Sequence, residues 1–179
     1  MKFYDFAGMR LLRWFLGNPT RKIHFKQLCR ELALSPLTVK TYCDEFVRRG
    51  WLQEERSANL RIFSIDNDHY LIKSFKRAFV LELLCREKIG NAVDDGIISL
   101  ALFGSHASGE YDEKSDIDLI VVGRREQVHH DLVKRLEKKL RKQVQVTLFP
   151  LEEWERRKKD DPFALSVLRT HVLLKGVPL

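Results

Sequence analysis

A short apolar run at residues 97–103 constrains the fold of this chain more than any other segment. Nearly every residue in it is apolar, and Gly104 and Ser105 follow at once. An apolar run without polar alternation is typical of a strand buried on both faces. Strands at 116–122 and 144–149 and helices at 126–141, 151–159 and 162–171 are predicted to follow. Strands that alternate with helices indicate a small α/β domain in the second half of the chain, with a short mixed sheet.

The first third of the chain has a different pattern. Apolar residues recur at helical spacing in 6–16, 24–33 and 36–49, and two strand-like runs follow at 51–56 and 60–65. Ser35 is a good N-cap for the third helix, and Pro36 suits the first helical position because its missing N–H would have no partner there. Helix, helix, short turn, helix and hairpin is the order of a winged helix-turn-helix domain.

The third helix and the hairpin carry the residues that we expect to contact DNA. Residues 1–66 hold 12 Lys and Arg against 7 Asp and Glu, which is the largest surplus of positive charge in the chain. A basic surface favours a polyanionic partner. The side chains predicted to face double-stranded DNA are Thr38, Lys40, Thr41, Tyr42, Arg48, Arg49, Arg56 and Arg61. The alternative is a domain that makes only protein contacts.

Residues 25–52 resemble winged-helix transcriptional regulators. The resemblance rests above all on Ser35-Pro36-Leu37-Thr38-Val39 and on the closing Arg49-Gly50-Trp51-Leu52. It implies a DNA-binding role in transcription regulation for residues 1–66. A long helical pattern at 68–88 then predicts a connector over residues 67–95, so the chain is expected to be an α+β protein of two domains, with the second at 96–179.

Composition excludes several classes of protein. Apolar residues make up 44% of the 179 and charged residues 32%, as in an ordinary globular protein. No apolar run approaches the ~20 residues of a membrane span, and residues 1–5 lack the apolar core of a signal peptide. We therefore expect a cytoplasmic protein without a membrane partner. Three widely spaced cysteines, Cys29, Cys43 and Cys85, are expected to be buried free thiols.

The segment after the first buried strand carries the chemistry. Gly104 lets a phosphate approach the backbone, and the Ser105 hydroxyl adds a hydrogen-bond donor. Asp116 and Asp118 are two residues apart on a predicted strand, so both carboxylates leave the same face, about 7 Å apart at the backbone. Two adjacent carboxylates repel each other unless a hard cation such as Mg²⁺ neutralises them. The pattern therefore predicts a site for a nucleotide and a metal.

Gly104-Ser105, ten residues and then Asp116-x-Asp118 resembles the signature of minimal nucleotidyltransferases in the DNA polymerase beta superfamily. The resemblance covers residues 97–150. It implies that Ser105 touches the phosphates of an NTP such as ATP, and that the catalytic Asp116 and Asp118 hold Mg²⁺.

One residue of that family's pattern has no counterpart here. The family usually supplies a third carboxylate from the next strand, where Gln145 and Thr147 stand in this chain. An amide cannot act as a general base near neutral pH. We expect one of the two to lie within reach of Asp116 and Asp118. His106, inside the motif, is expected to be an exposed loop residue.

Two functions follow from these observations. The first is a DNA-binding nucleotidyltransferase that moves a nucleoside monophosphate from an NTP to a hydroxyl acceptor. Some family members modify a partner protein, so the resemblance includes a protein hydroxyl among the acceptors. The alternative is a winged-helix transcriptional regulator whose second domain senses nucleotide without transferring it. The sequence leaves a homodimer open.

Overall fold

The computed structural model describes residues 6–179 and divides the chain into two compact units, Met1–Phe79 and Val80–Leu179. Residues 1–5, on which the expectation about a signal peptide rests, lie outside the described residues. Within residues 6–179, no helix has the length and apolar character needed to cross a membrane.

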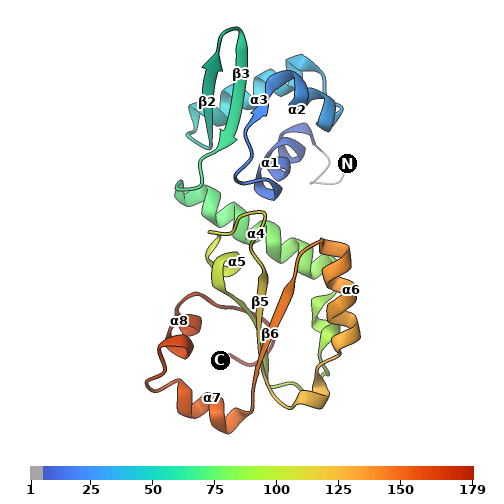
Figure 1. Ribbon diagram of the computed structural model, residues 1–179, viewed down its shortest axis with the longest axis vertical. Coiled ribbons are helices and arrows are strands. Elements are labelled where there is room, and N and C mark those ends of the chain that lie inside the picture. Colours follow the sequence, from blue (N-terminus) through green and yellow to red (C-terminus); the bar gives the residue numbers. More distant parts are fainter. Residues whose placement is uncertain (1–5) are drawn as a thin grey trace. The chain divides into compact units, whose positions relative to one another are not determined.

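The first unit packs three helices against a small antiparallel sheet (Figure 1). The elements are α1 (Ala7–Gly17), β1 (Ile23–His24), α2 (Phe25–Leu32), α3 (Pro36–Arg48), β2 (Leu52–Ser57) and β3 (Leu60–Ile65). The strands pair in the order β1-β3-β2. Leu11, Phe15, Leu28, Val39 and Phe63 are fully buried at the centre of its core. The predicted helices and hairpin are present, and the two-residue strand β1 was not predicted.

Local chemistry fixes the start of α3 as the sequence predicts. Ser35 is the N-cap, and its hydroxyl accepts a hydrogen bond from the backbone N–H of Thr38 at 3.1 Å. Pro36 occupies the first helical position. The helix buries Val39, Cys43 and Phe46, which share one face at helical spacing.

Helix α4 (Tyr70–Arg86) follows the hairpin, and the division into two units falls within it. Its N-terminal part buries Ile72 in the core of the first unit. Cys85, near its C-terminal end, is exposed, so the expectation of three buried thiols is wrong for this residue. Cys85 lies next to apolar Leu84 in the sequence, but on a helix a step of one residue turns a side chain to a different face.

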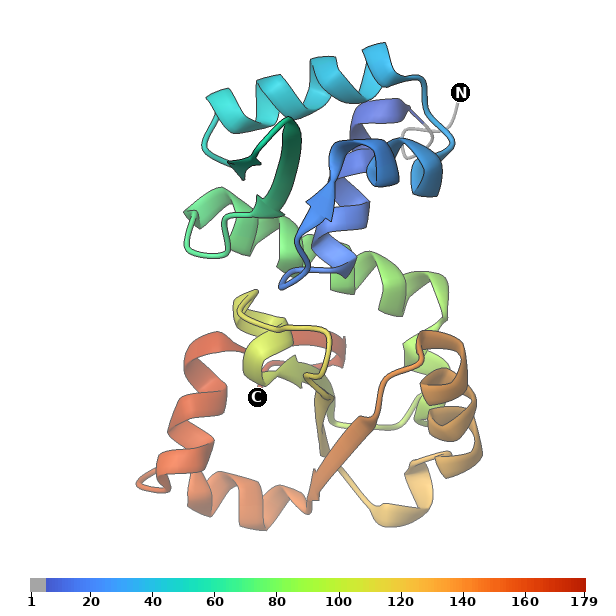
Figure 2. The ribbon, with the colours of Figure 1, turned by 45° about the horizontal axis from the view of Figure 1, so that its top comes forward.

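The second unit is built on a four-stranded mixed sheet. Its elements are η2 (Ile89–Ala92), β4 (Ser99–Phe103), α5 (Gly104–Ser108), β5 (Ile117–Val122), η3 (Arg125–Gln127), α6 (His130–Leu140), β6 (Val144–Phe149), α7 (Leu151–Arg157), α8 (Pro162–Thr170) and β7 (Val172–Gly176). The strands lie in the order β6-β5-β4-β7, with β5 and β6 parallel and the other pairs antiparallel. In both ribbon views α6 lies on one side of β6, and α7 and α8 on the other (Figures 1 and 2).

The sheet of this unit is buried as its sequence predicts. Ser99, Leu100, Ala101 and Leu102 in β4 are all buried, which confirms the prediction of a strand covered on both faces. The α8 side of the core gathers Ala101, Ile120, Val122, Trp154 and Val167. Several elements depart from the predictions. The short turn η2 was not predicted, and β5 begins at Ile117, so Asp116 precedes the strand. The helix predicted from residue 126 begins at His130, after the short turn η3, and strand β7 was not predicted.

Candidate functional site

The approach of Gly104 to Asp118 is the tightest feature of the site. Phe103, at the end of β4, pairs with Asp118 on β5, so the turn into α5 passes directly over the Asp118 carboxylate. Gly104 adopts a left-handed φ of +69°, and a Cβ on it would overlap Asp118 Oδ2 and lie 3.3 Å from Asp118 Cγ. Only glycine meets both conditions without strain. The glycine therefore places the backbone next to Ser105 against a carboxylate.

Asp118 lies at the start of β5, and Asp116 immediately precedes the strand. Ile117 and Leu119, which alternate with them, are buried, whereas the two aspartates are partly exposed. Burial, and then the charge of Asp116, raise the pKa of the Asp118 carboxyl above its usual value. A raised pKa means that the ionised form is held at a cost, as expected for two carboxylates on one face. A hard cation would relieve that cost.

Gln145 completes this end of the sheet. It lies opposite Asp118 in the parallel pairing of β5 with β6, and its side-chain amide donates a hydrogen bond of 2.8 Å to Asp116 Oδ2. This confirms that the strand after β5 brings Gln145 within side-chain reach of the aspartates. Thr147 pairs with Ile120, farther along the strand. The position nearest to the carboxylates therefore holds an amide that donates and cannot accept a proton.

Lys142 holds the loop that leads to Asp116, and the sequence reasoning missed this residue. Its ammonium donates to the carbonyl oxygens of Asp112, Glu113 and Ser115, each at 3.1 Å. Burial lowers the pKa of Lys142 from its usual value. The Asp112 side chain also accepts from the backbone and hydroxyl of Ser115. Three carbonyls gathered on one ammonium fix the backbone immediately before the first aspartate.

His106 is not an exposed loop residue, and that expectation is wrong. Its side chain is 1% exposed within α5, and its ring stacks on Tyr111 with centroids 4.5 Å apart and planes 6° apart. Tyr111 is itself buried, and burial raises the pKa of its hydroxyl. The His106 side chain therefore points from the Gly104–Ser108 turn into the protein, where it packs on Tyr111.

The residues predicted to bind DNA lie on α3 and the hairpin, but the cations among them are paired. Lys40 contacts Asp44 at 3.0 Å, Arg48 and Arg49 both contact Glu45, and Arg56 and Arg61 both contact Glu54. Arg61 also contacts Asp44. Each predicted cation therefore already has a carboxylate partner in the first unit.

The other predicted DNA-binding residues of α3 differ in exposure: Thr41 is exposed to solvent, whereas Thr38 and Tyr42 are partly buried. Thr41 is exposed, and its hydroxyl donates to the carbonyl of Leu37. Thr38 is half-buried beside the N-cap, where its hydroxyl lies 2.8 Å from that of Ser35. Tyr42 was expected to face away from the core, but it packs partly buried against the core and beside Gly8. Gly8 leaves the space that its ring fills, which accounts for the difference.

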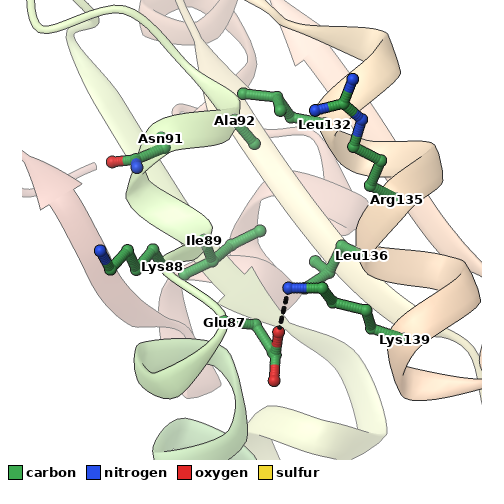
Figure 3. Close-up of a pocket in the computed structure, with 9 residues that line it drawn as sticks. All are labelled: Glu87, Lys88, Ile89, Asn91, Ala92, Leu132, Arg135, Leu136 and Lys139. Carbon is green, nitrogen blue, oxygen red and sulfur yellow. Dashed lines mark hydrogen bonds and ion pairs between the residues drawn. The ribbon is translucent and has the colours of Figure 1, made fainter.

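A separate cavity of about 220 Å³ lies between η2 and α6 (Figure 3). Leu132, Leu136 and Ile89 line it, and Lys139 donates to Glu87 across it at 2.9 Å. It shares no residue with the Gly104–Asp118 region. Glu87 is the one carboxylate among its lining residues, and it is paired with Lys139, so this cavity does not offer two neighbouring carboxylates as Asp116 and Asp118 do.

Comparison with known proteins agrees with this geometry. The family model described as "Nucleotidyltransferase domain" matches residues 85–168, which contain every element of the Gly104–Asp118 region. No curated protein matches the chain. One solved structure, described as "Crystal structure of the toxin-antitoxin with AMP-PNP", matches with 19% identity, a TM-score of 0.37, and coverage of 54% of this chain and 73% of that one. Residues 85–168 are therefore similar to nucleotidyltransferase domains.

Proposed function

We propose that the C-terminal unit transfers a nucleoside monophosphate from an NTP, ATP in the first instance, to a hydroxyl acceptor. The observation that carries the proposal is the pair of carboxylates, Asp116 and Asp118, within the matched residues, with Asp118 against the Gly104 turn. In such a transfer the acceptor oxygen bonds to the α-phosphorus. The bond between the α-phosphorus and the oxygen that bridges to the β-phosphorus breaks, and pyrophosphate leaves with that oxygen. The acceptor proton passes to solvent.

The residues fit a divalent cation as two of its ligands. Carboxylate oxygens are what Mg²⁺ prefers. Burial first, and then the charge of Asp116, raise the pKa of Asp118, and a bound cation would favour its ionised form. Among residues 6–179 there is no group of three or more acidic, histidine or cysteine side chains that could hold a metal. Asp116 and Asp118 would therefore hold Mg²⁺ together with phosphate oxygens of the nucleotide. A bound Mg²⁺ would supply charge stabilisation at the phosphates.

Gln145, in place of a carboxylate, leads us to expect a low rate of nucleotidyl transfer. General base catalysis contributes typically 10²–10⁴-fold, and an amide that donates to Asp116 cannot provide it. We therefore propose slow transfer. The alternative, a domain that binds nucleotide without turnover, is favoured by the same observation.

Labelled nucleotides distinguish these two functions. The purified protein is incubated with Mg²⁺, cell extract and either α-labelled or γ-labelled ATP. Transfer predicts label in a product only from the α position, and its loss in Asp118→Asn. Fractionating the extract into proteins, nucleic acids and small molecules then identifies the acceptor class. Gln145→Asp is expected to accelerate labelling. Equal labelling by the wild type and Asp118→Asn would contradict the proposal, and Mg²⁺-dependent binding without labelling would establish the nucleotide sensor.

Binding of double-stranded DNA by the N-terminal unit is a second proposal. The order of its elements and its positive charge support a winged-helix domain. The ion pairs on α3 suggest a specific test. Glu45→Gln frees Arg48 and Arg49, so it is expected to tighten DNA binding and to steepen its salt dependence. Glu31→Gln makes the same charge change on α2, beside Arg21, and serves as the control. Absence of duplex binding at low salt by all three proteins would refute the proposal.

A further inference from the structure

A cavity of about 420 Å³ adjoins the Gly104–Ser105 turn on the side of α8. One wall consists of the turn and the residues that flank it, namely Phe103, Gly104, Ser105, Ser108 and Glu110. The other wall is α8, which contributes Phe163, Ser166, Val167 and Thr170. The cavity therefore touches the proposed phosphate-binding turn and extends away from it along a helix that the sequence motif does not include.

Helix α8 is held firmly in the second unit. Asp161 caps it by accepting from the backbone N–H of Phe163 and Ala164, and Pro162 occupies its first turn. Ala164 and Val167 are buried in the core, at 0% and 2% exposure. These anchors fix the direction of the face that carries residues 163, 166 and 170, which share one side of the helix at spacings of three and four.

Phe163 is the unusual residue on this wall. Its ring meets the ring of Phe103 edge-on, with centroids 5.6 Å apart and planes 90° apart. The centroid of the Phe149 ring lies 6.2 Å from that of Phe163. It remains 38% exposed although large apolar neighbours surround it. An aromatic ring that packs against two other rings and is open to a cavity is a surface on which a planar group can stack.

The polar groups of the cavity suit hydroxyl and amino donors. Ser108, Ser166 and Thr170 supply hydroxyls, and Glu110 supplies a carboxylate, which Ser108 also contacts at 3.2 Å. The cavity contains no lysine or arginine among its lining residues, so it does not suit a polyphosphate. An aromatic face, hydroxyls and one carboxylate match the base and ribose of a nucleoside.

We propose that this cavity binds the nucleoside of the NTP, with the base stacked on Phe163 and the ribose toward Ser166 and Thr170. The inference rests on the proposed function, because the phosphates must lie at Gly104 and Asp118. It adds a binding residue on α8 and implies that the domain holds the nucleoside through shape and stacking. Every base has an aromatic face, so this contact alone predicts little preference among NTPs.

Two ligands separate the nucleoside contact from the phosphate contact. Calorimetry with Mg²⁺ measures the binding of ATP and of inorganic tripolyphosphate, which lacks a nucleoside, to the full chain. Phe163→Leu keeps an apolar side chain against Phe103 but removes the aromatic face, and Phe163→Trp restores it. Leu165→Ala is the matched control, since Leu165 is on the same helix, is 37% exposed and does not line the cavity. Thermal unfolding of each variant reports its folding.

Stacking contributes ~1–3 kcal/mol per base, which at ~1.4 kcal/mol per tenfold corresponds to roughly 5- to 150-fold in affinity. Phe163→Leu is therefore expected to weaken ATP binding about tenfold or more and to leave tripolyphosphate binding unchanged. Phe163→Trp and Leu165→Ala are expected to bind both ligands as the wild type does. Wild-type affinity of Phe163→Leu for ATP overturns the inference and leaves the proposed function standing. Equal weakening for both ligands also overturns it. A wild type that binds neither ligand removes the proposed function as well.

Discussion

Replacing Gly104 with alanine tests whether the close approach to Asp118 underlies both the fold and the site. A non-glycine residue at a φ of +69° costs roughly 1–2 kcal/mol. The new Cβ also displaces the Asp118 carboxylate, and a side chain forced from its rotamer costs about 0.5–1.5 kcal/mol. We expect a loss of about 2 kcal/mol. For a domain the size of the second unit this lowers the Tm by about 8–16 °C.

The assay combines thermal unfolding with calorimetry of Mg²⁺-ATP binding. Gly104→Ala is expected to lower the Tm and to abolish nucleotide binding, because the carboxylate and the turn can no longer occupy their places together. Gly96→Ala is the control, since a Cβ there meets nothing closer than Gln127 Nε2 at 3.7 Å and needs no left-handed φ. In a double-mutant cycle, Asp118→Ala should recover the part of the loss that comes from the clash. Unchanged stability and nucleotide binding in Gly104→Ala would refute the reasoning.

Three further predictions concern other parts of the chain. The hydrogen bond from Arg61 holds the pKa of Glu54 below its usual value, so the stability that this pair contributes is present above pH ~4.3 and is lost as the pH falls. Glu54→Gln should lower the free energy of unfolding by about 1 kcal/mol at pH 7, and the difference from the wild type should vanish in acid when unfolding is measured against pH. Lys142→Met should lower stability by about 1.5 kcal/mol and speed amide exchange in the 112–115 loop, whereas Lys114→Met, on the exposed side of that loop, should do neither. Iodoacetamide should modify exposed Cys85 in the native protein but not Cys43, because burial raises the pKa of that thiol to about 12; equal labelling by mass spectrometry would contradict this.

Patterns of local periodicity predicted most elements, and the failures have a common cause. The buried strand β4, the capped helix α3 and the two aspartates beside Gln145 follow from residues that are near one another in sequence or in adjacent strands. Strand β7 is different, because its partner β4 lies some seventy residues earlier. Val172–Gly176 is five residues long and lacks the alternation of apolar and polar residues that indicates a half-buried strand. Its hydrogen bonds depend on tertiary pairing, which periodicity does not report.

Side-chain surroundings were harder to predict than elements. His106 follows Gly104 and Ser105 in a polar segment, and its burial depends on Tyr111, which folds back to stack on it. The predicted DNA-binding cations looked available because their carboxylate partners were not considered. Glu45 lies one helical turn before Arg48, and Glu54 pairs with Arg61 across the hairpin. The sequence did not single out Phe163, since the role proposed for it depends on a cavity whose walls are α8 and the Gly104–Ser105 turn.

The hydrogen bond from Gln145 to Asp116 has a consequence for the assembly of the protein. A third carboxylate at this end of the sheet would add like-charge repulsion, so stability would depend more on a bound ion. The amide instead satisfies one carboxylate oxygen from within the chain. The unit can therefore reach its final fold before any ion arrives, and a chelator is expected to remove nucleotide binding while leaving the thermal transition in place.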